Sequence, residues 1–319
     1  MKKRTKSSSP IKTKGGKEQS LLTIPKIFVK LSLNMFKDYP VIDLHCHLRN
    51  DIPGHTKIAR ENGIDVAVYM ANCNPPLDNL ETIKKSLKKR RCCRAIPVSA
   101  ITKNLEGKEL VKIEKIRSYV AGFSDDGRYL ENLNLLKEIL KKNVLILAHC
   151  SPPYEIGIKK PYLETKFVER YLNIFVKTGG KLHIQHVSKK ETVELIRGAK
   201  KQGMKISCET CPHYFSYTKD DLDTKVNPPL AEKEDIAAIK KGLNDGTIDA
   251  IASDYAPLPR KTGIAGFKSF IPLSYGLVLE GVLSERALKE KLFINPKKII
   301  ESGGYKLNPV RSFLNMGSK

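Results

Sequence analysis

The chain has 319 residues, of which 40% are hydrophobic and 29% charged, a composition that excludes wholesale disorder and suits a large core. Its formal charge of +23 suggests a nucleic-acid-binding protein, but only 7% of residues are aromatic and tryptophan is absent, which argues against a single-strand binder. Seven cysteines without a regular spacing do not indicate a disulfide framework, so we expect a reducing, cytoplasmic setting.

The N-terminal segment concentrates the positive charge. Residues 1–37 hold ten basic residues and one acidic residue. We interpret this segment as a basic, solvated tail, and we expect residues 38–319 to form one folded domain with a helical extension at its C-terminus. The best apolar stretch, residues 27–36, is far shorter than the ~20 residues of a membrane span, so no membrane association is expected.

Short apolar, β-branched runs alternate with amphipathic segments along the rest of the chain. The runs predict eight strands, at residues 41–47, 66–72, 94–101, 119–126, 144–150, 181–188, 205–212 and 250–257. The clearest helix follows Ser188, where Ser188 and Glu191 form a capping-box pattern and Gly203 marks the end. This alternation predicts an α/β fold of the (β/α)8 barrel type, which typically needs ~250 residues. A doubly wound sheet would usually carry a glycine-rich loop after its first strand, and this chain has His45-Cys46-His47 there.

Histidines and aspartates gather where the predicted strands end. Active sites of barrels lie at the C-terminal ends of the strands. The residues found there are His45, His47, Asp126, His149, His186 and Asp254. Side chains alternate along a strand, so His45 and His47 share one face. Imidazole and carboxylate groups are typical zinc ligands, and the number of ligands suits two zinc ions that share a bridging carboxylate.

The remaining histidines and a Cys-x-x-Cys pair have structural interpretations. His183 lies three residues before His186, so we expect it to face the opposite side of its strand, against a helix. His55 and His213 fall in predicted loops. Cys208 and Cys211 form a single pair, which favours core packing over a zinc or redox site.

Six motifs together resemble the dihydroorotases of the amidohydrolase superfamily. They are VIDLHCHLR at 41–49, MANCNPP at 70–76, FSDDG at 123–127, HIQHVS at 183–188, KVNPPL at 225–230 and DGTIDAIASD at 245–254. The resemblance runs in order from about residue 40 to 300. The SDDG segment resembles the branch that bridges its metals with aspartate rather than a carboxylated lysine.

The resemblance implies a role for each candidate residue. His45 and His47 would bind the more buried zinc, and His149 and His186 the second. Asp126 would bridge the two metals. Asp254 would be the metal-linked acid and base. The substrate would be bound by Arg49, Asn72 and Asn227, with the planar fork of Arg49 pairing with the substrate carboxylate.

The implied reaction is the reversible cyclisation of N-carbamoyl-L-aspartate to L-dihydroorotate in pyrimidine (UMP) biosynthesis. In the ring-opening direction a metal-bound hydroxide would attack the ring amide carbonyl, and Asp254 would pass the proton to the leaving nitrogen. The partner is then a small-molecule substrate. A homodimer and an association with aspartate carbamoyltransferase are the protein contacts that the resemblance suggests.

The sequence also departs from the family pattern, which keeps alternatives open. The accessory β-sandwich of relatives is largely missing, and Tyr255 and Leu258 stand where relatives carry histidine. The chain could therefore act on a hydantoin or allantoin ring instead, or serve as a non-catalytic dihydroorotase-like scaffold for aspartate carbamoyltransferase. A nucleic-acid-binding role through the tail and the basic run at 84–94 is the least favoured alternative, because such runs are usually solvated faces.

Overall fold

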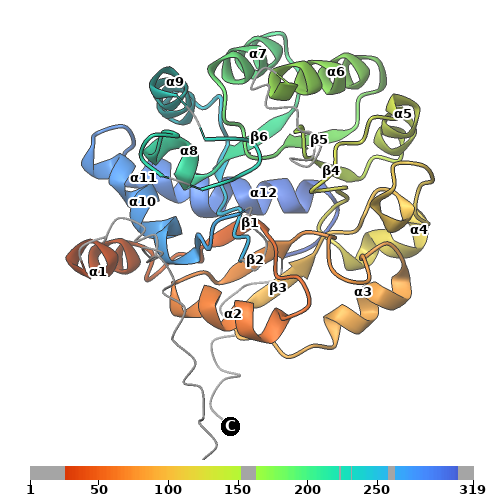
Figure 1. Ribbon diagram of the computed structural model, residues 1–319, viewed down its shortest axis with the longest axis horizontal. Helices are drawn as coiled ribbons and strands as arrows, with labels where there is room; N and C mark the ends of the chain where they lie inside the picture. Colours follow the sequence, from red (N-terminus) through yellow and green to blue (C-terminus); the bar gives the residue numbers. More distant parts are fainter. Residues whose placement is uncertain (1–25, 152–162, 223, 231, 258–262, 308–319) are drawn as a thin grey trace, which may run out of the picture.

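Short parallel strands form the centre of the molecule in the computed structural model, which describes residues 26–151, 163–222, 224–230, 232–257 and 263–307 (Figure 1). The strands are β1 (Ile42–Cys46), β2 (Val66–Tyr69), β3 (Arg94–Pro97), β4 (Leu145–Ala148), β5 (Lys181–Ile184), β6 (Ser207–Thr210) and β7 (Ala250–Ile251). They pair in chain order, β1 to β3 in one sheet and β4 to β7 in another. All these pairs are parallel, as expected where helical crossovers join successive strands.

Residues outside the named strands join the two sheets into a ring. Phe123 forms parallel bridges with Ser99 on one side and Ile146 on the other. At the other junction, Cys46 in β1 bridges to Tyr255 beyond β7, and the backbone N–H of His47 donates to the Tyr255 carbonyl at 2.7 Å. These bridges complete eight strand positions around a barrel, which confirms the predicted fold class.

The fourth strand position is shorter than the sequence predicts. Residues 119–126 are expected to form a strand, but Arg117–Tyr119 form a 3-10 turn, and the bridged residue in this segment is Phe123. The side chain of Asp125 explains where the ladder stops. Its carboxylate accepts hydrogen bonds from the backbone N–H groups of Ile101 and Thr102, at 2.8 and 3.0 Å, in place of a strand neighbour.

Helices surround the strands on the outside of the barrel (Figure 1). They are α1 (Lys26–Met35), α2 (Ile52–Glu61), α3 (Leu80–Leu87), α4 (Ile113–Ile116), α5 (Leu133–Lys141), α6 (Leu163–Thr178), α7 (Lys190–Lys201), α8 (Pro212–Ser216), α9 (Lys233–Asn244), α10 (Phe267–Leu279), α11 (Glu285–Lys289) and α12 (Asn295–Ser302). Within the described part of the chain, no helix combines the length and the apolar character that a membrane span requires.

The start of α7 differs from the predicted capping box. The helix begins at Lys190, two residues after Ser188, and Ser188 instead donates its hydroxyl to the buried carboxylate of Glu164 on α6. Glu164 also accepts from the backbone N–H of Ser188 at 3.1 Å. Asp235 on α9 accepts from the N–H of Lys190 at 2.8 Å. Carboxylates from neighbouring helices therefore satisfy the N–H groups that a local cap would have satisfied.

Part of the predicted tail is a packed helix. Residues Lys26–Met35 form α1, which contacts α10, and the side chain of Phe36 is buried. Leu33 approaches Gly63 so closely that a Cβ atom at Gly63 would lie 2.5 Å from Leu33 Cδ2. The prediction of a solvated tail is thus wrong for this stretch, because its apolar face covers the barrel. Residues 1–25 of the predicted tail lie outside the described residues.

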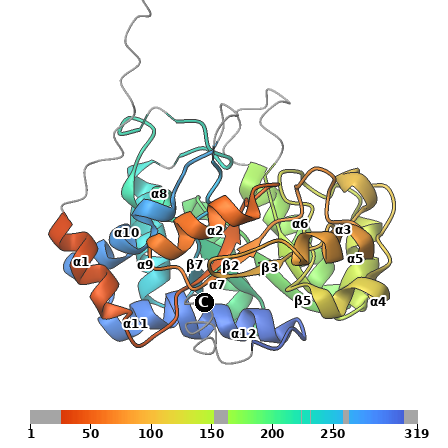
Figure 2. The ribbon, with the colours of Figure 1, turned by 90° about the horizontal axis from the view of Figure 1, so that it is seen from below.

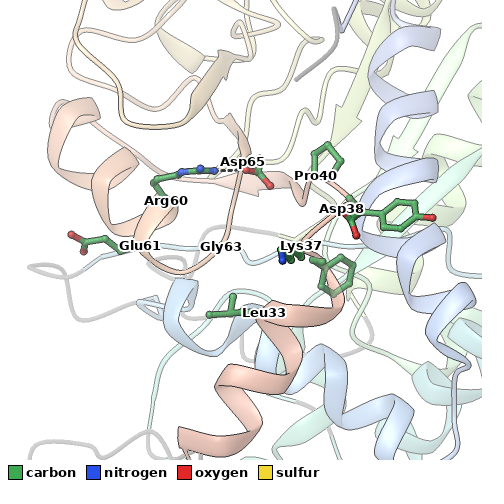
Figure 3. Close-up of a pocket in the computed structure, with 10 residues that line it drawn as sticks. Leu33, Lys37, Asp38, Pro40, Arg60, Glu61, Gly63 and Asp65 are labelled. Carbon is green, nitrogen blue, oxygen red and sulfur yellow. Dashed lines mark hydrogen bonds and ion pairs between the residues drawn. The ribbon is translucent and has the colours of Figure 1, made fainter. Parts of the chain in front are cut away.

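A cavity of about 350 Å³ lies between the end of α1 and α2 (Figure 3). Its polar wall includes Arg60, which forms an ion pair with Asp65. The other carboxylate oxygen of Asp65 accepts from the backbone N–H of Val41 at 3.0 Å. Val41 and Asp65 directly precede β1 and β2, so this cavity lies at the amino ends of the strands, away from the end where barrels place their chemistry.

At the end of the barrel next to α12, the interior is filled by a distinct apolar core. Side chains of β1 to β4 and β7 pack there against Ile299 and Ile300 of α12. Figure 2 shows α12 lying along this end of the barrel. A second, larger core lies between the strands and the outer helices. The helix α12 therefore covers this end of the barrel.

Candidate metal centre

The six histidines and aspartates predicted as ligands come together at the C-terminal ends of the strands. Each is buried, with between 0% and 9% of its surface exposed. They are His45 on β1, His47 just after it, Asp126 after the Phe123 bridge, His149 after β4, His186 after β5 and Asp254 after β7. Their ligand atoms form two groups that share Asp126, with the atoms of each group within 4.8 Å of one another.

The first group consists of His45, His47 and Asp126. The Nε2 atom of His45 lies 2.9 Å from Asp126 Oδ2, and the Nε2 atom of His47 lies 3.5 Å from Asp126 Oδ1. The two imidazoles therefore face the same carboxylate, as the alternation of side chains predicts. A β-bulge between Asp43 and Cys46 adds one residue to β1 relative to β2. This extra residue allows His45 to point into the barrel directly after Leu44, which packs in the interior core.

The second group consists of Asp126, His149 and His186. The Nδ1 atom of His149 lies 3.5 Å from Asp126 Oδ2 and 2.7 Å from Nε2 of His186. Asp126 thus lies between the two groups, with one oxygen facing His47 and the other facing His45 and His149. This position between the two groups would allow Asp126 to contribute to both.

Asp254 lies against the first group from the strand position next to β1. Its Oδ1 atom is 3.1 Å from His47 Nε2 and 3.6 Å from His45 Nε2. The neighbouring residue, Ser253, donates its backbone N–H at 2.8 Å and its hydroxyl at 2.5 Å to the buried carboxylate of Asp43. Asp43 therefore ties the strand that carries the His-x-His pair to the segment that carries Asp254.

Three of the predicted site residues have left-handed backbone conformations. Their φ angles are 50° for Arg49, 38° for His186 and 45° for Asp254. A non-glycine residue held in this region costs on the order of 1–3 kcal/mol, and such residues concentrate at functional sites. The turn at His186 also changes the direction of its side chain relative to the regular alternation in β5.

Buried carboxylates give the site a strong preference for positive charge. Burial opposes the charged form of His45, but Asp126 and Asp254 outweigh it and raise its pKa well above the usual value. Burial likewise opposes ionisation of Asp126 and Asp254, but the adjacent histidines hold the pKa of both carboxyl groups well below the usual value. Burial and the neighbouring His149 and His45 lower the pKa of His186 to about 3, so this imidazole is neutral and able to donate a lone pair.

The chemistry of these atoms fits divalent metal ions. Among the described residues, three buried polar atoms of the cluster lack a well-formed hydrogen bond: His45 Nε2, Asp126 Oδ2 and His186 Nδ1. Unsatisfied buried polar atoms in a native site call for an ion or another partner. Imidazole nitrogen and carboxylate oxygen are the ligand types that zinc takes in catalytic sites.

The predicted substrate residues border the cluster. Asn72 accepts a hydrogen bond from His47 Nδ1 at 3.0 Å, and its backbone carbonyl accepts from the guanidinium of Arg49 at 3.0 Å. The side-chain amide nitrogen of Asn227 lies 3.4 Å from His149 Nε2, and its oxygen accepts from Ser151 at 2.8 Å. The asparagines therefore also contact two of the histidines predicted to bind metal, a role that the sequence does not predict for them.

A deeper layer of polar residues was missed by the sequence prediction. Glu209 on β6 is fully buried, and its Oε1 atom lies 3.2 Å from His45 Nδ1. His183 lies on the other side of Glu209, at 3.1 Å from Oε2. The prediction that His183 faces a helix is wrong. The side chains of His183 in β5 and of Gln185 just after it point to the barrel interior, and the left-handed backbone of His186 interrupts the alternation between these residues and His186.

The other described residues singled out in the sequence pack within or against the protein core rather than join the cluster of ligands. Tyr255 is buried, stacks on Phe267 and hydrogen-bonds to His55 at 2.9 Å, so both residues pack away from the cluster. Cys211 and His213 lie within 4.8 Å of Asp254, but burial raises the pKa of the Cys211 thiol well above its usual value, which disfavours the thiolate that metals bind. Burial of Cys208 and Cys211 confirms the predicted core packing. Leu258 lies outside the described residues.

Comparisons with known proteins point to one family. The chain is 35% identical to a dihydroorotase of Geotalea daltonii, with 82% of this chain and 72% of that protein covered. It is 33% identical to a dihydroorotase of Trichlorobacter lovleyi (82% and 73% covered) and 34% identical to one of Clostridioides difficile (81% and 72% covered). A search of family models found no match.

Solved structures show the same fold. An L-hydantoinase from Arthrobacter aurescens superposes with a TM-score of 0.70 at 21% identity, over 82% of this chain and 70% of that one. A dihydroorotase from Campylobacter jejuni superposes with a TM-score of 0.65 at 20% identity, over 85% of each chain. Both similarities agree with the barrel described above.

Proposed function

The chain belongs to the dihydroorotase family of cyclic amidohydrolases, and from this premise we propose that it is a zinc-dependent dihydroorotase. The reaction would be the reversible cyclisation of N-carbamoyl-L-aspartate to L-dihydroorotate in pyrimidine biosynthesis. The observation that carries the proposal is the pair of three-ligand groups that share Asp126. A non-catalytic scaffold would have no need to keep both groups complete.

We assign one zinc ion to each group. His45, His47 and Asp126 would hold the first, and Asp126, His149 and His186 the second. When bound, the two metals would acidify a water molecule and polarise the amide carbonyl that is attacked. Each group supplies three protein ligands, which leaves room for water or substrate at the metal, as in other catalytic zinc sites.

Asp254 is the proposed acid and base. Its carboxylate is ionised, since the neighbouring histidines lower its pKa, and it projects beside His47. In ring opening it would accept a proton from the attacking water and deliver it to the leaving amide nitrogen. Ring closure would run these proton transfers in reverse. The connection from Ser253 to Asp43 holds the backbone next to Asp254 in place during both steps.

Arg49, Asn72 and Asn227 are the proposed substrate-binding residues. The guanidinium of Arg49 offers a fork of N–H donors that matches the substrate carboxylate. Asn72 lies beside His47 of the first group, and Asn227 lies beside His149 of the second group. Amide groups suit the N–H and C=O edges of the dihydroorotate ring.

We place the enzyme in the cytoplasm, with residues 38–319 as one catalytic domain and a small molecule as its substrate. Self-association into a homodimer and association with aspartate carbamoyltransferase are proposed contacts. Size-exclusion chromatography of the protein alone, and mixed with aspartate carbamoyltransferase, measures both.

The test is an activity assay on protein of known zinc content. We expect zinc-loaded protein to convert L-dihydroorotate and N-carbamoyl-L-aspartate into one another, and to act much more weakly on hydantoin and allantoin. Turnover of the hydantoin or allantoin ring alone would reassign the substrate while keeping the enzyme class. A zinc-loaded protein that converts none of these compounds would contradict the proposed function.

A further inference from the structure

A buried carboxylate beneath the metal centre has no role in the reaction described above. Glu209 lies on β6 with none of its surface exposed. Its two oxygens contact two different histidines: Oε1 lies 3.2 Å from Nδ1 of His45, and Oε2 lies 3.1 Å from Nε2 of His183. His183 is held in turn by Ser207, whose hydroxyl lies 2.8 Å from its Nδ1 atom.

Stability alone does not account for this carboxylate. A buried ionised group loses its hydration, and replacing a buried ion pair by well-packed apolar residues is often neutral or stabilising. Other interior positions of this barrel are apolar, including Leu145 and Leu147 on β4 and Ala250 on β7. The interior could therefore accept an apolar residue at position 209 without departing from its own pattern.

The geometry connects Glu209 to the ring nitrogen of His45 that faces away from the other ligands. The opposite ring nitrogen, Nε2, points to Asp126 and Asp254. Two groups lie 3.2 Å from the Nδ1 atom of His45, the Oε1 atom of Glu209 and the side-chain amide nitrogen of Gln185. The amide nitrogen has another acceptor in the sulfur of Met70 at 3.4 Å, whereas an ionised carboxylate can only accept a hydrogen bond. We therefore take Glu209 as the partner of the Nδ1 proton of His45, which leaves the Nε2 lone pair for a metal. Metal-binding histidines commonly donate their second N–H to a carboxylate in this way, which fixes the ring orientation and increases ligand basicity.

We propose that Glu209 is a positioning residue that sets the tautomer and orientation of His45 for metal binding, with His183 lying 3.1 Å from its second oxygen. The inference rests on the metal site of the proposed function. The partner of the neighbouring ligand is chemically different, because His47 Nδ1 meets the neutral amide oxygen of Asn72 at 3.0 Å. The His-x-His pair is thus oriented by one charged and one neutral group, and His45 is the stronger ligand of the two.

The direct test compares zinc affinity in native protein, Glu209→Gln and Glu164→Gln. Glu164 is the matched control, because it is also a buried glutamate but accepts from Ser188 and Lys189 rather than from a site histidine. Competition with a chromophoric chelator measures affinity, and circular dichroism confirms folding. We expect Glu209→Gln to weaken zinc binding by about 10- to 100-fold, the usual effect of losing such a partner, and Glu164→Gln to change it less than about 2-fold.

A spectroscopic readout separates positioning from a general loss of stability. Cobalt-substituted Glu209→Gln should show altered visible absorption bands, because the ligand field of His45 changes, whereas cobalt-substituted Glu164→Gln should match the native spectrum. Glu209→Asp retains the carboxylate and should recover part of the zinc affinity. If Glu209→Gln bound zinc as tightly as the native protein with the native cobalt spectrum, the inference would be overturned.

Two further outcomes are decisive. Should Glu209→Gln fail to fold, the Nδ1 proton of His45 can be observed by NMR in the zinc-loaded native protein. A downfield, slowly exchanging resonance supports the hydrogen bond to Glu209, and its absence overturns the inference. Native protein that binds no zinc would refute the proposed function itself, whereas native binding with an unaffected Glu209→Gln variant would refute the inference alone.

Discussion

Two neighbouring strands show that the barrel interior has an apolar region and a polar region. Leu147 on β4 and His183 on β5 are register partners, yet Leu147 packs in the apolar core above α12 and His183 contacts the buried carboxylate of Glu209. Two adjacent positions on the same face of one sheet therefore have different surroundings, one apolar and one polar. The apolar side, formed by β1 to β4 and β7, stabilises the fold, and the polar side, formed by β5 and β6, supports the histidines at the rim.

The comparison predicts that the two regions can be damaged separately. Substitutions at the rim or on the polar side should change metal binding or turnover more than unfolding. Substitutions in the apolar core should do the reverse, because core residues contribute through burial and packing rather than through ligand geometry.

The largest difference between the effect on turnover and the effect on zinc binding is expected for Asp254→Asn. Asparagine retains the shape of the side chain but cannot take up the proton, so turnover should fall by about 10²- to 10⁴-fold. The zinc content should stay near that of the native protein, because both three-ligand groups remain intact. Steady-state kinetics with metal analysis of the same sample checks this. Native turnover in Asp254→Asn would remove Asp254 from the mechanism.

Leu147→Ala is the opposite experiment in the apolar region. Removing a buried leucine side chain costs about 2–5 kcal/mol in free energy of unfolding. Leu147 is 2% exposed and packs in the interior core, so we expect a loss within that range and an unchanged zinc affinity. Denaturant unfolding and chelator competition measure the two quantities. A large loss of zinc affinity would show that the two regions are coupled.

Zinc removal should destabilise the protein by an amount near the lower part of the range given for Leu147→Ala. A ligand that binds the folded state stabilises it by about 3 kcal/mol when its free concentration is 100 times the dissociation constant. Thermal unfolding of chelated and zinc-loaded protein measures the difference, and Glu209→Gln should reduce it. An equal melting temperature with and without zinc would contradict a metal centre built into the barrel.

The smallest effect is expected for Tyr255→Phe. This change removes the hydrogen bond to His55 but keeps the stacking on Phe267, so it should cost about 1 kcal/mol. Turnover should change less than about 2-fold, because the Tyr255 ring contacts Phe267 and His55 rather than the histidines and aspartates of the candidate metal centre. Denaturant unfolding and kinetics provide the check, and a strong change in KM would place Tyr255 in the substrate site after all.

The sequence predicts the rim of the barrel well because of its periodicity. His45 and His47 alternate with buried residues, and both histidines face Asp126 as expected. The predictions fail where side chains from other elements override a local pattern. Ser188 bonds to Glu164 instead of capping its own helix, and Asp125 ends the fourth strand position early.

The polar layer could not be derived from one sequence. Regular alternation from His186 predicts the wrong face for His183, because His186 has a left-handed backbone conformation that only the folded structure reveals. The position of Glu209 does give one indication in the sequence, because it is a charged residue within a segment that is predicted to be a strand. Its partner, however, lies on β1, more than 160 positions earlier in the chain, and only the closed barrel brings the two together.

The proposed two-zinc centre at the His and Asp rim is tested most directly by a titration of metal-free protein with zinc, with L-dihydroorotate hydrolysis measured at each step. We predict negligible turnover without metal and a rise that reaches its plateau at two zinc ions per chain. Full activity in metal-free protein, or no activity at any zinc content, would contradict it.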